Sequence, residues 1–174
     1  MSPNERLELF EEIALPHLNA AHNLARWMTR SDQDAQDVVQ EAYLRAFRFF
    51  DSFQGGDGKA WVLEVVRNTC RTWMARRNRS SAVPFDEAAH SGGTPQPSQE
   101  AAAAGRQKMG ILRGCLEALP AEFREVLVMR ELEEMSYREI AAVAGLAMGT
   151  VMSRLARARK RLEECAQKRS GEAA

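Results

Sequence analysis

Residues 80–107 contain too few apolar side chains to fold, and they divide the chain into two short halves. The segment starts with Ser80-Ser81, is rich in Gly and Pro at 92–98, ends near four alanines at 101–104, and has only Val83 and Phe85 as sizeable apolar residues. Such a composition cannot offset the conformational entropy lost on folding. We therefore predict an N-terminal domain at 1–79 and a C-terminal domain at 108–170. A flexible linker at 80–107 is expected to join them.

Apolar residues in both halves recur at helical spacing, and no segment has the period of two of a strand. Pro16 predicts a break or kink, Ser31 can cap the following helix, and Gly55, Gly56 and Gly58 predict a loop before a third helix at about 59–77. The expected fold is all-α. The residues expected to face the core are Phe10, Ile13, Leu18, Ala21, Leu24, Ala25, Met28, Ala35, Val38, Val39, Ala42, Ala46, Phe49, Val62, Val66, Thr69, Trp73, Ile111, Leu112, Cys115, Leu116, Leu119, Phe123, Val126, Leu127 and Leu132.

The stretch from Ser136 to Leu162 has the pattern of a helix-turn-helix. Ser136 and Glu139 form a capping box, and Gly145 can take the left-handed conformation that ends one helix. Leu146 then closes the turn. The next helix is anchored at intervals of four, three and four by Val151, Leu155, Ala158 and Leu162. In DNA-binding proteins of this kind, the second helix enters the major groove.

The charge of the chain is zero overall but is locally segregated. Lys plus Arg (24) equal Asp plus Glu (24), so any binding to a polyanion must come from local clusters of basic residues. Seven basic residues and two acidic ones lie between Gly145 and Arg169. This segregation favours DNA binding by the second helix over the alternative of a helical hairpin with a solvated basic face.

The predicted third helix combines basic and aromatic residues. Six basic residues and one acidic residue, Glu64, lie between Lys59 and Arg79, together with Trp61 and Trp73. Such a mixture can hold a phosphate backbone while aromatic rings stack on exposed bases. The alternative is that Trp61 and Trp73 are ordinary core residues.

The three cysteines, Cys70, Cys115 and Cys165, are odd in number and contain no CxxC pair, so we expect buried, reduced thiols and no zinc site.

Charged residues make up 28% of the chain and no long apolar run occurs, which excludes a membrane-embedded protein. The N-terminus lacks a secretory signal, so we expect a cytoplasmic protein. Glu87-Ala-Ala-His90 is a lone ExxH, and no catalytic motif accompanies it. We expect neither enzymatic activity nor a metal or other cofactor.

Three segments in order resemble bacterial sigma factors. Residues Asp34 to Arg48 resemble region 2.2. Residues Ala60 to Thr69, with Arg76-Arg77, resemble regions 2.3 and 2.4, and Leu119 to Leu162 are similar to region 4. Their order and spacing resemble the extracytoplasmic-function (ECF) subfamily, which keeps only sigma domains 2 and 4. The resemblance implies promoter-specific initiation of transcription with core RNA polymerase, and an anti-sigma factor as a further partner.

The resemblance also implies which residues contact each partner. The helix of region 2.2 would present a polar face to a coiled coil of the largest polymerase subunit, the third helix and the loop from Asp51 to Lys59 would hold the −10 element, and the helix-turn-helix would read the −35 element. The implied polymerase contacts are Asp34, Asp37, Gln40, Glu41 and Arg45. The implied −10 contacts are Lys59, Trp61, Arg67, Asn68, Arg71, Arg76 and Arg77. The implied −35 contacts are Thr150, Met152, Ser153, Arg154, Ala156, Arg157, Lys160 and Arg161.

Two residues of the last group depart from the pattern of the family. Many members carry Lys or Arg at the position of Met152, and Ala156 is small where a larger contacting side chain can stand. The preferred −35 sequence therefore stays open. The alternative function is a helix-turn-helix regulator that binds DNA without polymerase, and the region 2-like segments argue against it.

Overall fold

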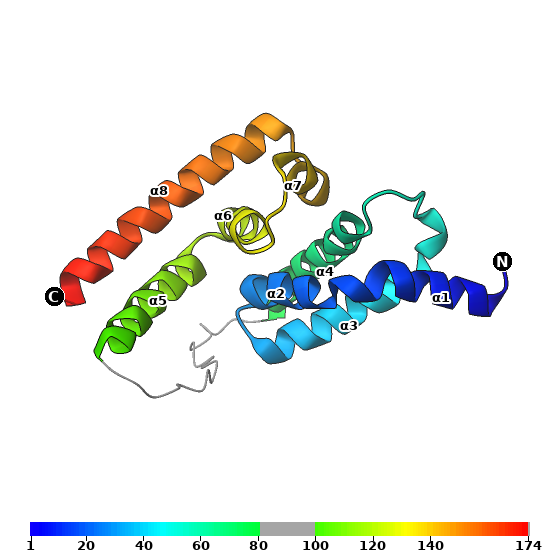
Figure 1. Ribbon diagram of the computed structural model, residues 1–174, viewed down its shortest axis with the longest axis horizontal. Coiled ribbons are helices and arrows are strands. Elements are labelled where there is room, and N and C mark those ends of the chain that lie inside the picture. Colours follow the sequence, from blue (N-terminus) through cyan, green and yellow to red (C-terminus); the bar gives the residue numbers. More distant parts are fainter. Residues whose placement is uncertain (81–99, 174) are drawn as a thin grey trace.

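The computed structural model describes residues 1–80 and 100–173, and all regular structure in these ranges is helical. The prediction of an all-α fold is confirmed. Figure 1 shows two groups of helices, with the N- and C-termini at opposite ends of the long axis. The N-terminal group comprises α1 (Pro3–Ala14), α2 (Leu18–Thr29), α3 (Asp32–Arg48) and α4 (Gly58–Ser80). The C-terminal group comprises α5 (Glu100–Ala118), α6 (Ala121–Leu127), α7 (Tyr137–Ala144) and α8 (Met148–Ala173).

The predicted break at Pro16, cap at Ser31 and loop at Gly55 and Gly56 are confirmed, and α4 extends three residues beyond the predicted end near Arg77 and includes Gly58. Pro16 lies in a short 3-10 segment, Leu15–His17, that separates α1 from α2. The Ser31 hydroxyl accepts a hydrogen bond from the Asp34 amide at 3.3 Å and caps α3. Gly55 and Gly56 have φ values of 84° and 100°, which other residues rarely adopt, and they form the loop before α4.

The core of the N-terminal domain lies between α2, α3 and α4, and α1 packs against α4. Leu24, Val38, Leu63 and Val66 are at most 1% exposed. The phenol of Tyr43 donates a hydrogen bond to the Ala14 carbonyl at 2.8 Å and so fixes the end of α1 on α3.

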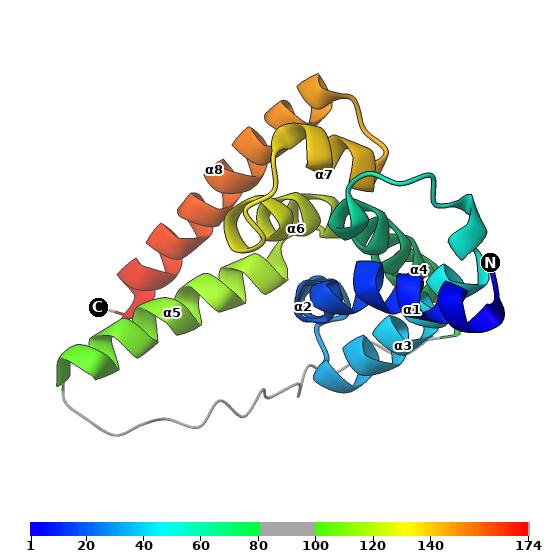
Figure 2. The same cartoon turned by 45° about the vertical axis from the view of Figure 1, so that its right-hand side comes forward.

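The C-terminal domain contains the predicted helix-turn-helix. Ser136 and Glu139 make both hydrogen bonds of the capping box of α7. Gly145 has a φ of 66° and ends that helix, and α8 leaves at an angle of 100° to α7. Figure 2 shows α5 and α8 side by side, with α6 and α7 packed near the start of α8.

No single helix in the described ranges is both long and apolar enough to span a membrane. By length and composition, α7 and α8 pass that test only as a pair, and the pair is sharply bent.

The start of α5 differs from the predicted linker boundary. The helix begins at Glu100, whereas the linker was expected to reach residue 107. Alanine has the highest helix propensity, and the alanines at 101–104 extend the helix backwards. Residues 81–99, which include the Glu87–His90 motif, lie outside the described residues.

Four apolar residues predicted to face the core are exposed instead. Phe49 is 62% exposed because it caps the end of α3, and Phe50 takes the buried position. Leu132 is 48% exposed at the end of a π-helical turn, Val128–Leu132, which closes with a hydrogen bond from the Glu133 amide to the Val128 carbonyl. The wider turn breaks the period of 3.6 on which the prediction relied. The other two, at the start of α2 and on α5, are Leu18 and Leu112.

The prediction of reduced thiols is wrong for two of the three cysteines. Cys115 on α5 and Cys165 on α8 form a disulfide, with 5.8 Å between their Cα atoms. The two residues are 50 positions apart, and only the packing of α5 on α8 brings them together. Cys70 is free and buried.

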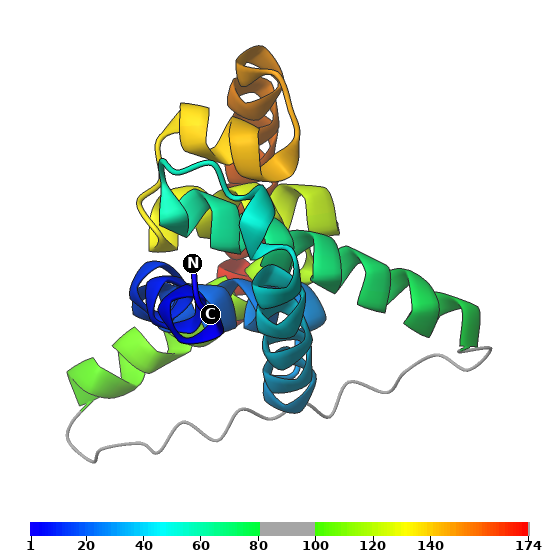
Figure 3. The ribbon, with the colours of Figure 1, turned by 90° about the vertical axis from the view of Figure 1, so that its right-hand side faces the viewer.

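The two domains pack against each other. Helix α4 contacts α7, and α2 contacts both α6 and the π-helical turn. Figure 3 shows α4 beneath the helix-turn-helix in this arrangement. The interface therefore covers part of α4, the helix that carries the seven side chains implied to contact the −10 element.

Candidate nucleic-acid interface

The first half of α8 presents a polar and basic face. Val151, Leu155 and Ala158 are at most 1% exposed and anchor the helix on the domain. The residues between them point outward: the implied −35 contacts Thr150, Met152, Ser153, Ala156, Arg157, Lys160 and Arg161 are exposed, and Arg154 is half-buried. The prediction that one stripe anchors the helix is confirmed. The outward stripe has the position that a recognition helix needs to reach base edges.

The basic residues of α8 differ in how firmly they are held. The Arg161 guanidinium lies 4.6 Å from the ring centre of Phe123, so it covers the domain core as well as facing solvent. Arg159 donates two hydrogen bonds to Glu131, at 2.8 and 3.1 Å, and these bonds raise the pKa of Arg159. Arg157 and Lys160 are also exposed on α8.

The outer face of α3 carries the implied polymerase contacts. Asp37 and Gln40 are exposed. Glu41 and Arg45 form an ion pair one turn apart at 3.4 Å. Asp34 differs, because it pairs with Arg77 of α4 at 2.8 Å and so supports the packing of α3 on α4.

Sequence reasoning missed Leu44, which is 63% exposed on the same face. It lies three and four residues after Glu41 and Gln40, outside the buried stripe of α3. An apolar side chain at a polar helical position was the available signal. A partner that covered this leucine would remove its apolar surface from water, which favours association.

The aromatic residues of α4 are half-buried and packed within the N-terminal domain. The ring of Trp61 lies 4.9 Å from that of Phe53 and 6.0 Å from that of Phe50. Trp73 lies beneath the guanidinium of Arg77 at 5.0 Å. These contacts favour the alternative that both tryptophans are core residues. Among the other implied −10 contacts, Asn68 and Arg76 are exposed.

Two further implied −10 contacts, Arg67 and Arg71, meet a buried carboxylate of the other domain. Arg67 donates to Glu125 through Nε at 2.9 Å and through an Nη at 3.1 Å, and Arg71 donates to it through an Nη at 3.0 Å. The side chain of Glu125 is fully buried and that of Arg67 is 11% exposed. Removal of one partner from a buried ion pair typically costs about 3–5 kcal/mol. This cluster could not be predicted, because Glu125 lies 58 positions from Arg67 in the chain.

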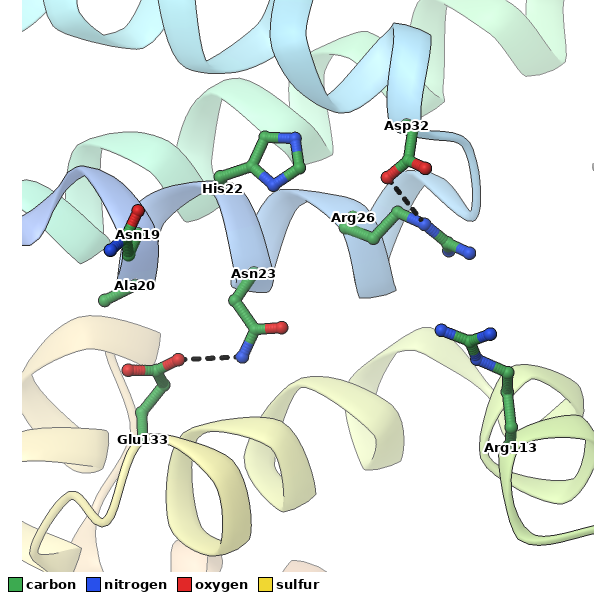
Figure 4. Close-up of a pocket in the computed structure, with 8 residues that line it drawn as sticks. All are labelled: Asn19, Ala20, His22, Asn23, Arg26, Asp32, Arg113 and Glu133. Carbon is green, nitrogen blue, oxygen red and sulfur yellow. Dashed lines mark hydrogen bonds and ion pairs between the residues drawn. The ribbon is translucent and has the colours of Figure 1, made fainter. Parts of the chain in front are cut away.

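The implied −10 contact Lys59 also meets the C-terminal domain. Its ammonium donates to the Glu133 carbonyl at 3.1 Å and lies 3.5 Å from the Glu133 carboxylate. Figure 4 shows that Asn23 of α2 donates to the same carboxylate, at 2.8 Å. Asn23 and Glu133 border a groove of about 510 Å³ between the domains, lined by Asn19, Ala20, His22, Asn23, Arg26, Asp32, Arg113 and Glu133.

Burial at the domain interface also shifts two pKa values. It raises the pKa of the Cys70 thiol to about 12, and the nearby Glu125 carboxylate adds to the shift. It lowers the pKa of Arg124 to about 10, with a contribution from Arg30. Both groups keep their ordinary protonation state at neutral pH.

Comparison with known proteins identifies the family. Residues 13–80 match Sigma-70 region 2, and residues 109–162 match Sigma-70, region 4. The chain is 34% identical over 156 residues to the ECF RNA polymerase sigma-E factor of Escherichia coli strain K12, covering 84% of this chain and 82% of that protein. The chain belongs to the ECF sigma factor family. The predicted resemblance is confirmed.

A second relative is the ECF RNA polymerase sigma factor SigE of Mycolicibacterium smegmatis, which is 32% identical over 168 residues. The alignment covers 95% of this chain, and the chain spans 64% of the length of that relative. Among solved structures, the sigma factor RpoE in complex with the anti-sigma factor NepR from Bartonella quintana has a TM-score of 0.75 and 29% identity, covering 91% of this chain and 96% of that one. CnrH in complex with the cytosolic domain of CnrY shares the fold, with a TM-score of 0.65 and 24% identity.

Proposed function

We propose that the chain is a promoter-specificity factor that binds core RNA polymerase and starts transcription at promoters with −10 and −35 elements. The observation that supports this proposal is the exposed, basic face of α8, which is the second helix of the helix-turn-helix. The chain that carries it belongs to the ECF sigma family. In this function the chain has no enzymatic activity and needs no cofactor. It works in the cytoplasm, where polymerase and DNA are found.

The two domains divide the work. Residues 1–79 bind polymerase through the outer face of α3, where Leu44 adds an apolar anchor among Asp37, Gln40, Glu41 and Arg45. The same domain holds the separated strands of the −10 element with α4 and the loop from Asp51 to Lys59. Residues 108–170 read the −35 element as duplex with the outward residues of α8. Residues 81–99, between α4 and α5, connect the two in the chain.

An anti-sigma factor is a further proposed partner. The structurally similar sigma factor RpoE was co-crystallised with the anti-sigma factor NepR. The structure of CnrH is a complex with the cytosolic domain of CnrY. The exposed face of α3 and the groove beside α2 are surfaces that such a protein can cover.

Run-off transcription tests the function directly. Purified core polymerase is mixed with the chain and a library of genomic fragments, and the RNA 5′ ends are sequenced. Start sites that need the chain and share two spaced elements support the proposal. Unchanged initiation, or tight promoter binding by the chain alone, would refute it. An Asp37→Arg variant in the same assay tests whether α3 makes the contact with polymerase.

A further inference from the structure

Three residues that the proposed function assigns to the −10 element are held by carboxylates of the other domain. Arg67 and Arg71 contact Glu125, and Lys59 contacts Glu133. By contrast, the residues assigned to the −35 element lie on the exposed side of α8. The packing of the two domains therefore occupies one DNA-binding face and leaves the other accessible.

The Glu125 carboxylate binds its arginines in the way that a phosphate group would. One oxygen accepts from Arg67 Nε at 2.9 Å, and the other accepts from Arg67 at 3.1 Å and from Arg71 at 3.0 Å. Guanidinium groups bind carboxylates and phosphates with the same forked geometry. A backbone phosphate and this carboxylate therefore compete for the same donors.

The charge balance favours exchange with DNA. Two guanidiniums face one carboxylate, which leaves one positive charge without compensation from Glu125. A DNA strand brings one negative charge per nucleotide and can compensate both. Arg71 is 44% exposed at the edge of the cluster, so an approaching strand reaches it first.

We propose that Glu125 is an internal phosphate mimic that holds the C-terminal domain over the −10 face of α4 in the free chain, with Glu133 as a second contact. This inference rests on the assignment of α4 to the −10 element. Polymerase can still dock on the closed form, because Asp37, Gln40 and Leu44 of α3 remain exposed in it. Separation of the domains then frees Arg67 and Arg71 for the DNA.

The main test compares Glu125→Gln with the wild type and with Glu131→Gln as a matched control. Glu131 pairs with Arg159 at 2.8 Å inside the C-terminal domain, and its side chain is 55% exposed. We expect Glu125→Gln to increase the radius of gyration in small-angle X-ray scattering and to reduce hydrogen-exchange protection in α4, α6 and α7. Protection in α5 and α8 should stay, which separates opening of the domains from unfolding of the C-terminal domain.

The functional readout uses single-stranded DNA 20-mers of random sequence, measured without polymerase. If the closed form outnumbers the open form by ten or more to one, the apparent affinity rises at least tenfold when the contact is broken. We expect that increase for Glu125→Gln and a change of less than twofold for Glu131→Gln. A folded Glu125→Gln variant with the dimensions and the DNA affinity of the wild type would overturn the proposal.

A second variant keeps the test decisive if Glu125→Gln unfolds α5 and α8. Glu133→Gln weakens the contacts with Lys59 and Asn23 without placing a new group in the buried cluster. It should open the domains to a smaller extent, and no change in scattering or exchange would count against the proposal. Run-off transcription by the wild type is measured separately. If the wild type starts transcription but the variants do not open, the internal contact is refuted and the proposed function stands. If the variants open but the wild type starts no transcription, the proposed function is refuted instead.

Discussion

The disulfide between Cys115 and Cys165 gives a stability prediction that can be worked from the structure. The bond closes a loop of 50 residues that contains α6, α7 and most of α8. In the chain-entropy description, closing a loop of that length destabilises the unfolded state by about 4 kcal/mol, and measured values are typically about 2–4 kcal/mol. We predict that Cys165→Ser lowers the free energy of unfolding of the C-terminal domain by that amount. Cys165 is the better position to change, because Cys115 is only 1% exposed.

Hydrogen exchange is the suitable assay, because all three tryptophans lie before residue 80 and their fluorescence reports on the N-terminal domain. A loss of about 2–4 kcal/mol lowers protection in the core of α6 by roughly 30- to 900-fold. Reductant should produce the same loss in the wild type and no further loss in Cys165→Ser. Equal protection of oxidised wild type and Cys165→Ser would refute the reasoning.

Three further predictions concern single side chains. Arg157→Ala should weaken binding of the polymerase complex to duplex −35 DNA by about 1–3 kcal/mol if Arg157 contacts a base edge, and an equal loss on unrelated sequences would assign it to a phosphate instead. Asp37→Arg should lower the affinity for core polymerase at least tenfold in a pull-down titration, while unaltered affinity would remove Asp37 from the docking face. Burial raises the pKa of Tyr43 to about 12, above the value of about 10 in an unfolded chain, so its contribution to stability is complete below pH 10 and is lost as the pH rises towards 12. The free energy of unfolding is measured in urea at pH 9 and at pH 11.5. Between these pH values it should fall less for Tyr43→Phe than for the wild type, and an equal fall in both proteins would contradict the prediction.

The helix-turn-helix could be predicted from the sequence almost residue by residue. Its signals are local: a capping box at Ser136, a left-handed Gly145 and an anchoring stripe from Val151 to Ala158 are all specified within about 25 residues. The same holds for the break at Pro16. Local chemistry decides where a helix starts and ends, so it can be read without knowledge of the fold.

The features that could not be predicted depend on contacts between distant segments. Glu125 gives the same signal in the sequence as any surface glutamate, yet it is fully buried where Arg67 and Arg71 of α4 in the other domain contact it. Cys115 and Cys165 lack the close spacing that marks a cysteine pair, and antiparallel packing of two helices joins them. The π-helical turn that exposes Leu132 departs from the 3.6-residue period of an α-helix, and no single residue in the sequence indicates that departure.

Helix α8 is continuous from Met148 to Ala173, so a tilt at one end displaces the other. Thr150 stands near one end and Cys165 is held to α5 fifteen residues later, about 22 Å away along the axis. A tilt of about 10° around the tethered end would displace the other end by about 4 Å, which exceeds the rise of about 3.4 Å from one base pair to the next. In the proposed function, the position of Thr150 along the DNA therefore depends on the disulfide at Cys165 as well as on the buried stripe near the start of α8.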